Sequence, residues 1–119
     1  MQTTTTTCSN LNLSLPPELF AEIFPFHLVF NQERKILQVG KVLQQIYPEL
    51  ALGKQLEQQF RIVRPSIQFD FDAIRQRSRS LFMLESLSNG MKLKGQMVYV
   101  EHQEAMFFLC SPWVTDIAS

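Results

Sequence analysis

The side chains in this sequence that are best suited to acid–base catalysis near neutral pH are two histidines. His27 stands inside the apolar run FHLVF, and His102 stands inside the polar stretch EHQE. Neither is accompanied by a Gly-x-Ser-x-Gly motif, by a cysteine at a recognised catalytic spacing or by a paired-carboxylate motif. We therefore predict that His27 is a sheet-surface residue, that His102 is a solvated turn residue, and that the chain has no catalytic residues and is not an enzyme.

Residue types that bind metals are too scattered to predict a metal site. No close-spaced pair of the zinc type occurs among the cysteines and histidines, which are Cys8, His27, His102 and Cys110. Asp70 and Asp72 stand close together in FDFD, but no further acidic ligand follows, so we predict that one of them caps a helix. Cys8 lies in a polar leader and Cys110 in a predicted strand, which favours free thiols over a disulfide.

The composition is typical of one globular domain. The chain has 119 residues, of which 45% are apolar and ten are Phe. Eleven basic residues balance eleven acidic ones, which argues against nucleic acid and anionic membranes as partners. The first residues lack a signal-peptide pattern, and no run of about 18 apolar residues occurs. We therefore expect a cytoplasmic protein.

The elements that must position these residues follow from hydrophobic spacing. Residues 1–13 are a Thr-rich leader, which we expect to be flexible. An amphipathic helix is predicted over residues 15–24 by the helical spacing of Leu15, Leu19, Phe20, Ile23 and Phe24. The folded domain is expected to span residues 14–114, and residues 115–119 read as the start of a C-terminal linker helix.

An α+β fold with five strands is predicted for the rest of the chain. The strands are expected at residues 26–30, 35–39, 81–87, 91–100 and 105–111. The intervening residues 40–80 show only short helical or irregular segments, cut by prolines and by Gly53. The predicted sheet is antiparallel, with these short helices crossing between its second and third strands.

Gly95 interrupts a strand and leaves a side-chain vacancy in the sheet. Asn89-Gly90 is a strong signal for a two-residue hairpin turn. This turn pairs Phe82 with Met97, Leu84 with Gly95, and Glu85 with Lys94. The next turn pairs Met97 with Phe108 and Gly95 with Cys110.

The vacancy at Gly95 has three possible explanations. It makes room for a crossing helix or bulky side chain, it marks a bulge, or it forms the floor of a small-ligand pocket. The candidate pocket residues are Leu84, Gly95, Met97, Phe108 and Cys110.

The opposite face of this sheet is half apolar and half polar. The strand alternation places six apolar side chains there: Leu81, Met83, Val98, Val100, Phe107 and Leu109. The polar half consists of Glu85, Lys92, Lys94 and Gln96. An exposed apolar patch of this size calls for a cover. The helix over residues 15–24 is the available amphipathic element, and it could cover its own chain or a second copy.

A basic cluster precedes the third predicted strand. The segment RQRSR contains Arg75, Arg77 and Arg79, and Arg61 and Arg64 stand earlier in the chain. The simplest interpretation is a solvated helix face with arginine stems packed along it. The alternative is a docking surface for an acidic partner domain, because arginine suits bidentate contacts with carboxylates.

The order of elements is that of a PAS domain, and the motifs point to one family. FPFHLVFN, YPEL, RIVRP, LKGQMVYV and FFLCSP, in this order, resemble the H-NOX-associated PAS domain. That domain occurs in soluble guanylate cyclases and in bacterial sensor histidine kinases. The cyclase version has a long insertion where this chain has only SLSNGM. No haem domain precedes Met1 in this sequence, so the sensor would be a separate chain if Met1 is the natural start.

The resemblance implies a homodimer that relays a signal from an H-NOX haem sensor to a C-terminal output domain, most simply a histidine kinase. The expected dimer interface consists of Leu19, Phe20, Ile23, Phe24, Val98, Phe107 and Leu109. Arg75, Arg77 and Arg79 are the candidate docking residues for the sensor. The helix before the third predicted strand, FDAIRQRS, lacks the cysteine of flavin-type PAS domains and the histidine of haem-type ones, so no cofactor is expected. The alternative function is a PAS sensor that binds its own small apolar ligand.

Overall fold

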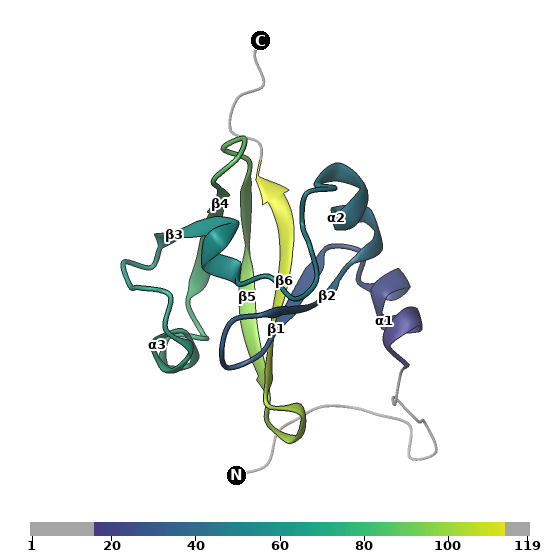
Figure 1. Cartoon of the computed structure of the whole chain (residues 1–119). Helices are drawn as coiled ribbons and strands as arrows, with labels where there is room; N and C mark the ends of the chain where they lie inside the picture. The colour runs from purple at the N-terminus through teal and green to yellow at the C-terminus, as the bar shows by residue number, and fades with distance from the viewer. Residues whose placement is uncertain (1–15, 114–119) are drawn as a thin grey trace.

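A six-stranded antiparallel sheet forms the centre of the structure, a computed structural model that describes residues 16–113. The strands lie in the order β2-β1-β6-β5-β4-β3, so the first and last strands of the chain are neighbours (Figure 1). Their bounds are β1 His27–Phe30, β2 Ile36–Val39, β3 Phe60–Arg64, β4 Leu81–Ser86, β5 Lys92–Val100 and β6 Ala105–Trp113. The predicted leader at residues 1–13 and linker helix at residues 115–119 lie outside the described residues.

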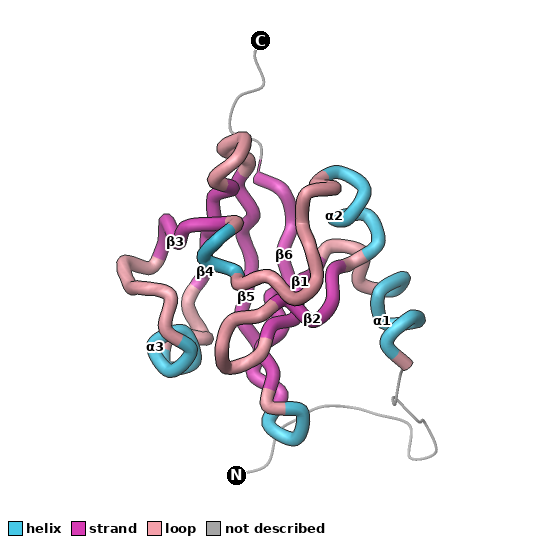
Figure 2. Tube along the Cα trace, viewed as in Figure 1, coloured by secondary structure: helices cyan, strands magenta, loops and turns pink. Residues whose placement is uncertain are grey.

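Short helices lie at both ends of the sheet. Figure 2 shows α1 and α2 beside β1 and β2, and α3 beside β3 and β4. The α-helices are α1 Pro17–Ile23, α2 Lys41–Ile46 and α3 Phe71–Gln76, and the single-turn 3-10 helices are η1 Leu56–Gln58 and η2 Glu101–Gln103. Asp70 caps α3, because its Oδ2 accepts a hydrogen bond from the backbone N–H of Ala73 at 3.0 Å. The prediction that one aspartate of FDFD is an N-cap is confirmed.

The hydrophobic core lies on one face of the sheet, which we call the inner face. Its largest fully buried side chains are Phe30, Tyr47, Phe60, Phe82 and Phe108. Because α2, η1 and α3 all contribute buried residues to this core, they close the inner face. The opposite, outer face is left to α1 and to solvent.

The prediction of five strands is wrong, because residues 40–80 contain a sixth. Strand β3 pairs with β4 at the edge of the sheet. Its burial pattern does not alternate cleanly, since a bulge falls between Ile62 and Arg64. The two arginines within β3 and the following Pro65 give this segment the pattern of an irregular one. An edge strand that carries charged side chains is a common way to block pairing with other chains.

The β4–β5 turn differs from the predicted two-residue turn. Strand pairing aligns Phe82 with Gly95, Leu84 with Leu93, and Glu85 with Lys92, a shift of two residues from the prediction. The turn therefore spans residues 87–90, with Gly90 N–H bonded to the Ser86 carbonyl at 3.0 Å. Only Gly90 adopts a positive φ in it, at 76°. Since side chains alternate with period two, the shift leaves every residue on its predicted face.

The predicted β5–β6 pairing is confirmed, with Met97 beside Phe108 and Gly95 beside Cys110. The reason for glycine at position 95 is visible in this pair of strands. A Cβ built on Gly95 would collide with the carbonyl oxygen of Leu109 and approach the Cα of Cys110 to 2.6 Å. The backbone of β6 therefore occupies the space that a side chain at position 95 would need.

A second close backbone approach fixes the end of α1 against the start of α2. The Pro25 carbonyl accepts hydrogen bonds from the N–H groups of Val42 and Leu43, at 3.2 and 3.1 Å. Gly40 makes this approach possible, because a Cβ there would lie 2.6 Å from the Pro25 carbonyl carbon. The chain that leaves α1 is thus held where β1 begins.

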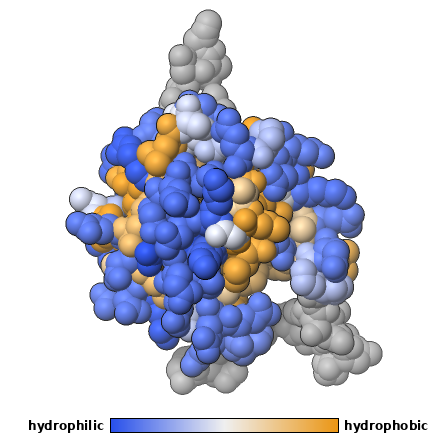
Figure 3. All heavy atoms as spheres, in the orientation of Figure 1, coloured by the Kyte–Doolittle hydropathy of each residue, from blue (hydrophilic) through white to orange (hydrophobic). Residues whose placement is uncertain are grey.

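The face of the molecule seen in Figure 3 is mainly polar. In Figure 3 hydrophilic side chains predominate, and hydrophobic ones form separate patches. No helix within residues 16–113 is long and apolar enough to cross a membrane. Within the same residues, no three His, Cys, Asp or Glu side chains gather as a metal site would require.

Candidate functional site

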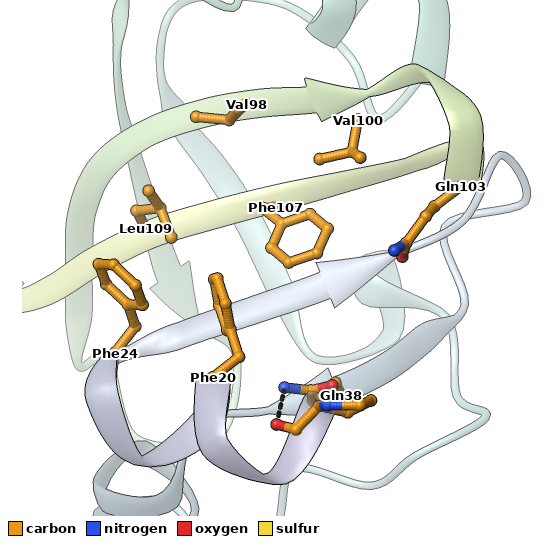
Figure 4. Close-up of a pocket in the computed structure, with 9 residues that line it drawn as sticks. Phe20, Phe24, Gln38, Val98, Val100, Gln103, Phe107 and Leu109 are labelled. Carbon is orange, nitrogen blue, oxygen red and sulfur yellow. Dashed lines mark hydrogen bonds between the residues drawn. The ribbon is translucent and has the colours of Figure 1, made fainter. Parts of the chain in front are cut away.

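An apolar groove lies between α1 and the outer face of the sheet (Figure 4). We call it the outer-face groove; its volume is about 320 Å³. It is lined by Pro17, Phe20, Phe24, Gln38, Val98, Val100, Gln103, Phe107 and Leu109. Figure 4 shows Phe20 and Phe24 pointing from α1 toward the side chains of β6, while Val98 and Val100 come from β5.

The helix α1 covers the outer face of its own chain, mainly through Phe20. The Phe20 ring lies 4.7 Å from that of Phe24, 5.3 Å from that of Phe107 and 4.9 Å from the imidazole of His27, centre to centre. No residue of α1 is fully buried, and Ile23 and Phe24 remain 51% and 41% exposed. The helix is therefore lightly attached, and much of its apolar surface remains available to another molecule.

A small polar network under α1 connects the helix to the sheet. His27 is fully buried, and its Nδ1 lies 2.7 Å from the Phe24 carbonyl oxygen. Its Nε2 lies 3.0 Å from Nε2 of Gln38, which also donates to the Pro17 carbonyl at 3.3 Å. Burial lowers the pKa of His27, against a smaller opposite effect of the Phe24 hydrogen bond. His27 is on the sheet surface as predicted, although α1 covers it.

The residues predicted for a dimer interface are only partly gathered in one place. Phe20, Phe24, Val98, Phe107 and Leu109 all line the outer-face groove. Leu19 lies on the other side of α1, in a hollow shared with Val39 of β2, and Ile23 is exposed. Sequence reasoning missed Pro17, Gln38 and Gln103 as lining residues. The strand alternation of β2 was the available signal for Gln38.

The candidate pocket around Gly95 coincides with packed structure. Leu84 and Phe108 are fully buried, Met97 is 3% exposed, and all three belong to the hydrophobic core. Burial raises the pKa of the Cys110 thiol to about 12, so this thiol stays protonated near neutral pH. Together with the β6 backbone against Gly95, this packing supports the interpretation that the glycine permits a close approach of strands.

The three arginines of the basic cluster differ in their surroundings. The guanidinium of Arg75 lies over the ring of Tyr99, 4.1 Å from its centre. Arg77 and Arg79 are exposed, and Arg79 shares a shallow hollow with Gln96 and Val98. Because Val98 also lines the outer-face groove, Arg79 lies close to the groove.

Comparison with known proteins identifies the family. The sequence matches the family model described as Heme NO binding associated, over residues 13–90 and 85–119. The chain belongs to this family. The two matched segments overlap in the β4–β5 turn, where the cyclase domains are expected to carry their insertion. The resemblance to the H-NOX-associated domain is thereby confirmed.

Soluble guanylate cyclase subunits are among the curated relatives of the chain. The chain is 32% identical to guanylate cyclase soluble subunit beta-2 of Rattus norvegicus over 111 residues, which are 84% of the chain and 16% of that protein. It is 32% identical to subunit alpha-1 of Canis lupus familiaris over 114 residues, 87% of the chain and 16% of that protein. It is 29% identical to subunit alpha-2 of Homo sapiens over 113 residues, 87% of the chain and 15% of that protein. The chain thus spans about one sixth of these relatives.

Proposed function

We propose that this chain is a non-enzymatic, cytoplasmic PAS signalling domain. It forms a homodimer and relays a signal from a haem nitric oxide/oxygen sensor to an output domain, for which a histidine kinase is our preferred candidate. Membership of the Heme NO binding associated family supports the link to a haem sensor. The relatives are cyclase subunits matched over a small share of their length, which agrees with a role in connecting other domains.

The outer-face groove is the observation that supports dimerisation. It joins the half-exposed α1 to an apolar strip of β5 and β6, where Val98 is 41% exposed. Pairing this surface with its two-fold copy would bury both strips, as isologous interfaces do. The relay then consists of a change in the geometry of this interface when the sensor binds.

Substitution of Phe20 and Phe24 by serine is expected to weaken the dimer without unfolding the domain. Both side chains line the groove and neither belongs to the buried core cluster. Sedimentation equilibrium over a wide concentration range, with circular dichroism to check folding, measures the effect. A double variant of the exposed Leu52 and Leu87 to serine is the matched control, since these residues lie outside the groove. An unchanged dimer in the Phe20→Ser, Phe24→Ser variant would refute this interface.

The basic cluster is the proposed docking site for the haem sensor. Arg77 and Arg79 are the better residues to test, because Arg75 also packs on Tyr99. Reversing both to glutamate is expected to weaken binding of a purified H-NOX haem domain at least tenfold, about 1.4 kcal/mol. Isothermal titration calorimetry measures the affinity. Reversal of Lys35 and Lys54 to glutamate changes the net charge by the same amount and should leave the affinity for the haem domain unchanged. Equal losses of affinity in both variants would contradict a specific site.

The outer-face groove also supports the second candidate function, a sensor of a small apolar ligand. Its volume of about 320 Å³ is at the lower end of the range for ligand sites. An absorbance spectrum of the sedimentation sample, followed by organic extraction and mass spectrometry, tests this candidate. A colourless sample that yields no stoichiometric small molecule would remove it.

A further inference from the structure

We propose that α1 is a releasable cover of the outer face, and that protonation of His27 releases it. This inference concerns the attachment of α1 to its own sheet, so it holds whether or not the chain dimerises. It rests on the polar network under α1, on the absence of fully buried residues in the helix, and on the surroundings of His27.

The polar network holds both ends of α1. At the C-terminal end, His27 Nδ1 bonds to the carbonyl of Phe24, the residue that ends the helix. At the N-terminal end, the amide of Gln38 bonds to the carbonyl of Pro17, the first residue of the helix. His27 and Gln38 bond to each other, so one imidazole and one amide connect both ends of α1 to β1 and β2.

The hydrogen-bond partners determine the protonation state of His27 in the docked state. A carbonyl oxygen only accepts, so Nδ1 must carry the proton that bonds to Phe24. The Gln38 NH₂ group faces both the Pro17 carbonyl and His27 Nε2, so Nε2 must be an unprotonated acceptor. The network as built therefore requires the neutral imidazole with its proton on Nδ1.

A second proton on His27 cannot be accommodated without losing a hydrogen bond. Protonated Nε2 would point an N–H at the N–H of Gln38, so two donors would face each other. If the Gln38 amide rotated to present its oxygen to His27, that oxygen would also replace the donor that bonds to Pro17. The first arrangement breaks the bond between His27 and Gln38, which separates the two parts of the network, and the second breaks the bond between Gln38 and Pro17, which releases the N-terminal end of α1.

No described charged group offsets this effect. On the elements packed against His27, β2 has no titratable side chain and β6 has only Cys110, which packs against the core. On α1, Glu22 pairs with the exposed Lys41, and Glu18 is exposed. Among residues 16–113, no ion pair with His27 is found, and the hydrogen bonds of its imidazole are those to Phe24 and Gln38.

The pH dependence follows from these surroundings. Burial holds the pKa of His27 below its usual 6.5 while α1 is docked, and undocking removes that burial. The undocked state therefore binds the second proton more readily. The docked state of α1 therefore has its full stability above pH 6.5, the pKa of the undocked imidazole. This stability is lost as the pH falls from 6.5 through the lowered pKa of the docked imidazole. Release exposes the rings that α1 covers, Phe107 among them.

Amide hydrogen exchange followed by NMR tests the proposal on the 119-residue chain. The reporters are the N–H groups of Phe20 and Phe24, which bond to the Pro16 and Phe20 carbonyls within α1. We expect their protection factors to fall at least about fivefold between about pH 8 and about pH 5, as for one lost hydrogen bond. The core amides of Leu84 and Phe108 should keep theirs.

Two histidine variants distinguish His27 from general acid effects. His102→Gln removes the exposed histidine and should reproduce the wild-type pH dependence. His27→Gln removes the titrating group and should make α1 protection independent of pH. The same pH-dependent loss in His27→Gln, or equal α1 protection in the wild type at both pH values, would overturn the proposal. If His27→Gln does not fold, NMR titration of the wild-type imidazole decides: a His27 pKa at or above 6.5 overturns it too.

Discussion

Replacement of Gly95 by alanine is expected to lower the free energy of unfolding by about 3 kcal/mol or more, the upper range for forcing extra atoms into a packed site. The added Cβ would collide with the Leu109 carbonyl oxygen and lie 2.6 Å from the Cα of Cys110. Both obstacles are backbone atoms in the nine-residue strand β6, so neither can rotate away as a side chain would. Relief requires β5 and β6 to separate at the centre of the sheet.

Urea unfolding followed by circular dichroism measures this effect, and two controls isolate its cause. Gly53→Ala meets no atom within 4 Å but adopts a φ of 84°, so it should cost about 1 to 2 kcal/mol from backbone strain alone. Gln96→Ala changes the exposed neighbour on the same strand and should cost little. If Gly95→Ala were as stable as Gln96→Ala, the β6 backbone would not approach position 95 as closely as described. The hypothesis of a pocket beside position 95 would then regain support.

The sheet could be predicted from the sequence wherever a long, mainly apolar run is bounded by a polar turn. Strands β5 and β6 are both long, and their pairing at Met97 and Phe108 agrees with the prediction. Strand β3 was missed because it is bulged and contains two arginines, so its pattern differs little from that of an irregular segment. Its place at the sheet edge depends on pairing with β4, which is a tertiary contact.

The turn between β4 and β5 shows how a strong local signal can give the wrong register. Asn-Gly favours a two-residue turn, but the Ser86 hydroxyl accepts bonds from the N–H groups of Ser88 and Asn89, at 3.2 and 3.3 Å. These bonds stabilise a four-residue turn in which only Gly90 needs a positive φ. Hydrogen bonds of this kind depend on the Ser86 rotamer, and the residue pattern does not reveal it.

The apolar part of the candidate site could be predicted, and its polar part could not. Helical spacing identified Phe20 and Phe24, and strand alternation identified Phe107 and Leu109, all of which line the groove. Helical spacing does not specify whether α1 covers its own chain or a second copy. The geometry of the connection at Pro25 and Gly40 decides this. The bond between His27 and Gln38 joins two strands and was likewise beyond the sequence pattern.

Substitution of Val98 by aspartate is expected to raise the dissociation constant of the proposed dimer at least about a hundredfold, or about 2.7 kcal/mol. Val98 lines the outer-face groove beside its cross-strand neighbour Phe107. In a two-fold dimer the new carboxylate appears twice, each time in apolar surroundings. The monomer should lose less than about 1 kcal/mol, because Val98 is 41% exposed in a single chain.

Sedimentation equilibrium of Val98→Asp beside Leu52→Asp measures this effect. The control introduces the same carboxylate in place of another exposed aliphatic side chain, Leu52, which is 63% exposed and lies outside the groove. If both variants dissociated equally, net charge would be the cause, and if neither did, the interface would lie elsewhere on the chain. If the dimer dissociated in Val98→Asp but not in Leu52→Asp, the interface would include β5 and not only the helix α1. Combined with loss of the dimer in the Phe20→Ser, Phe24→Ser variant, that result would mean that the helix and the sheet form one continuous interface.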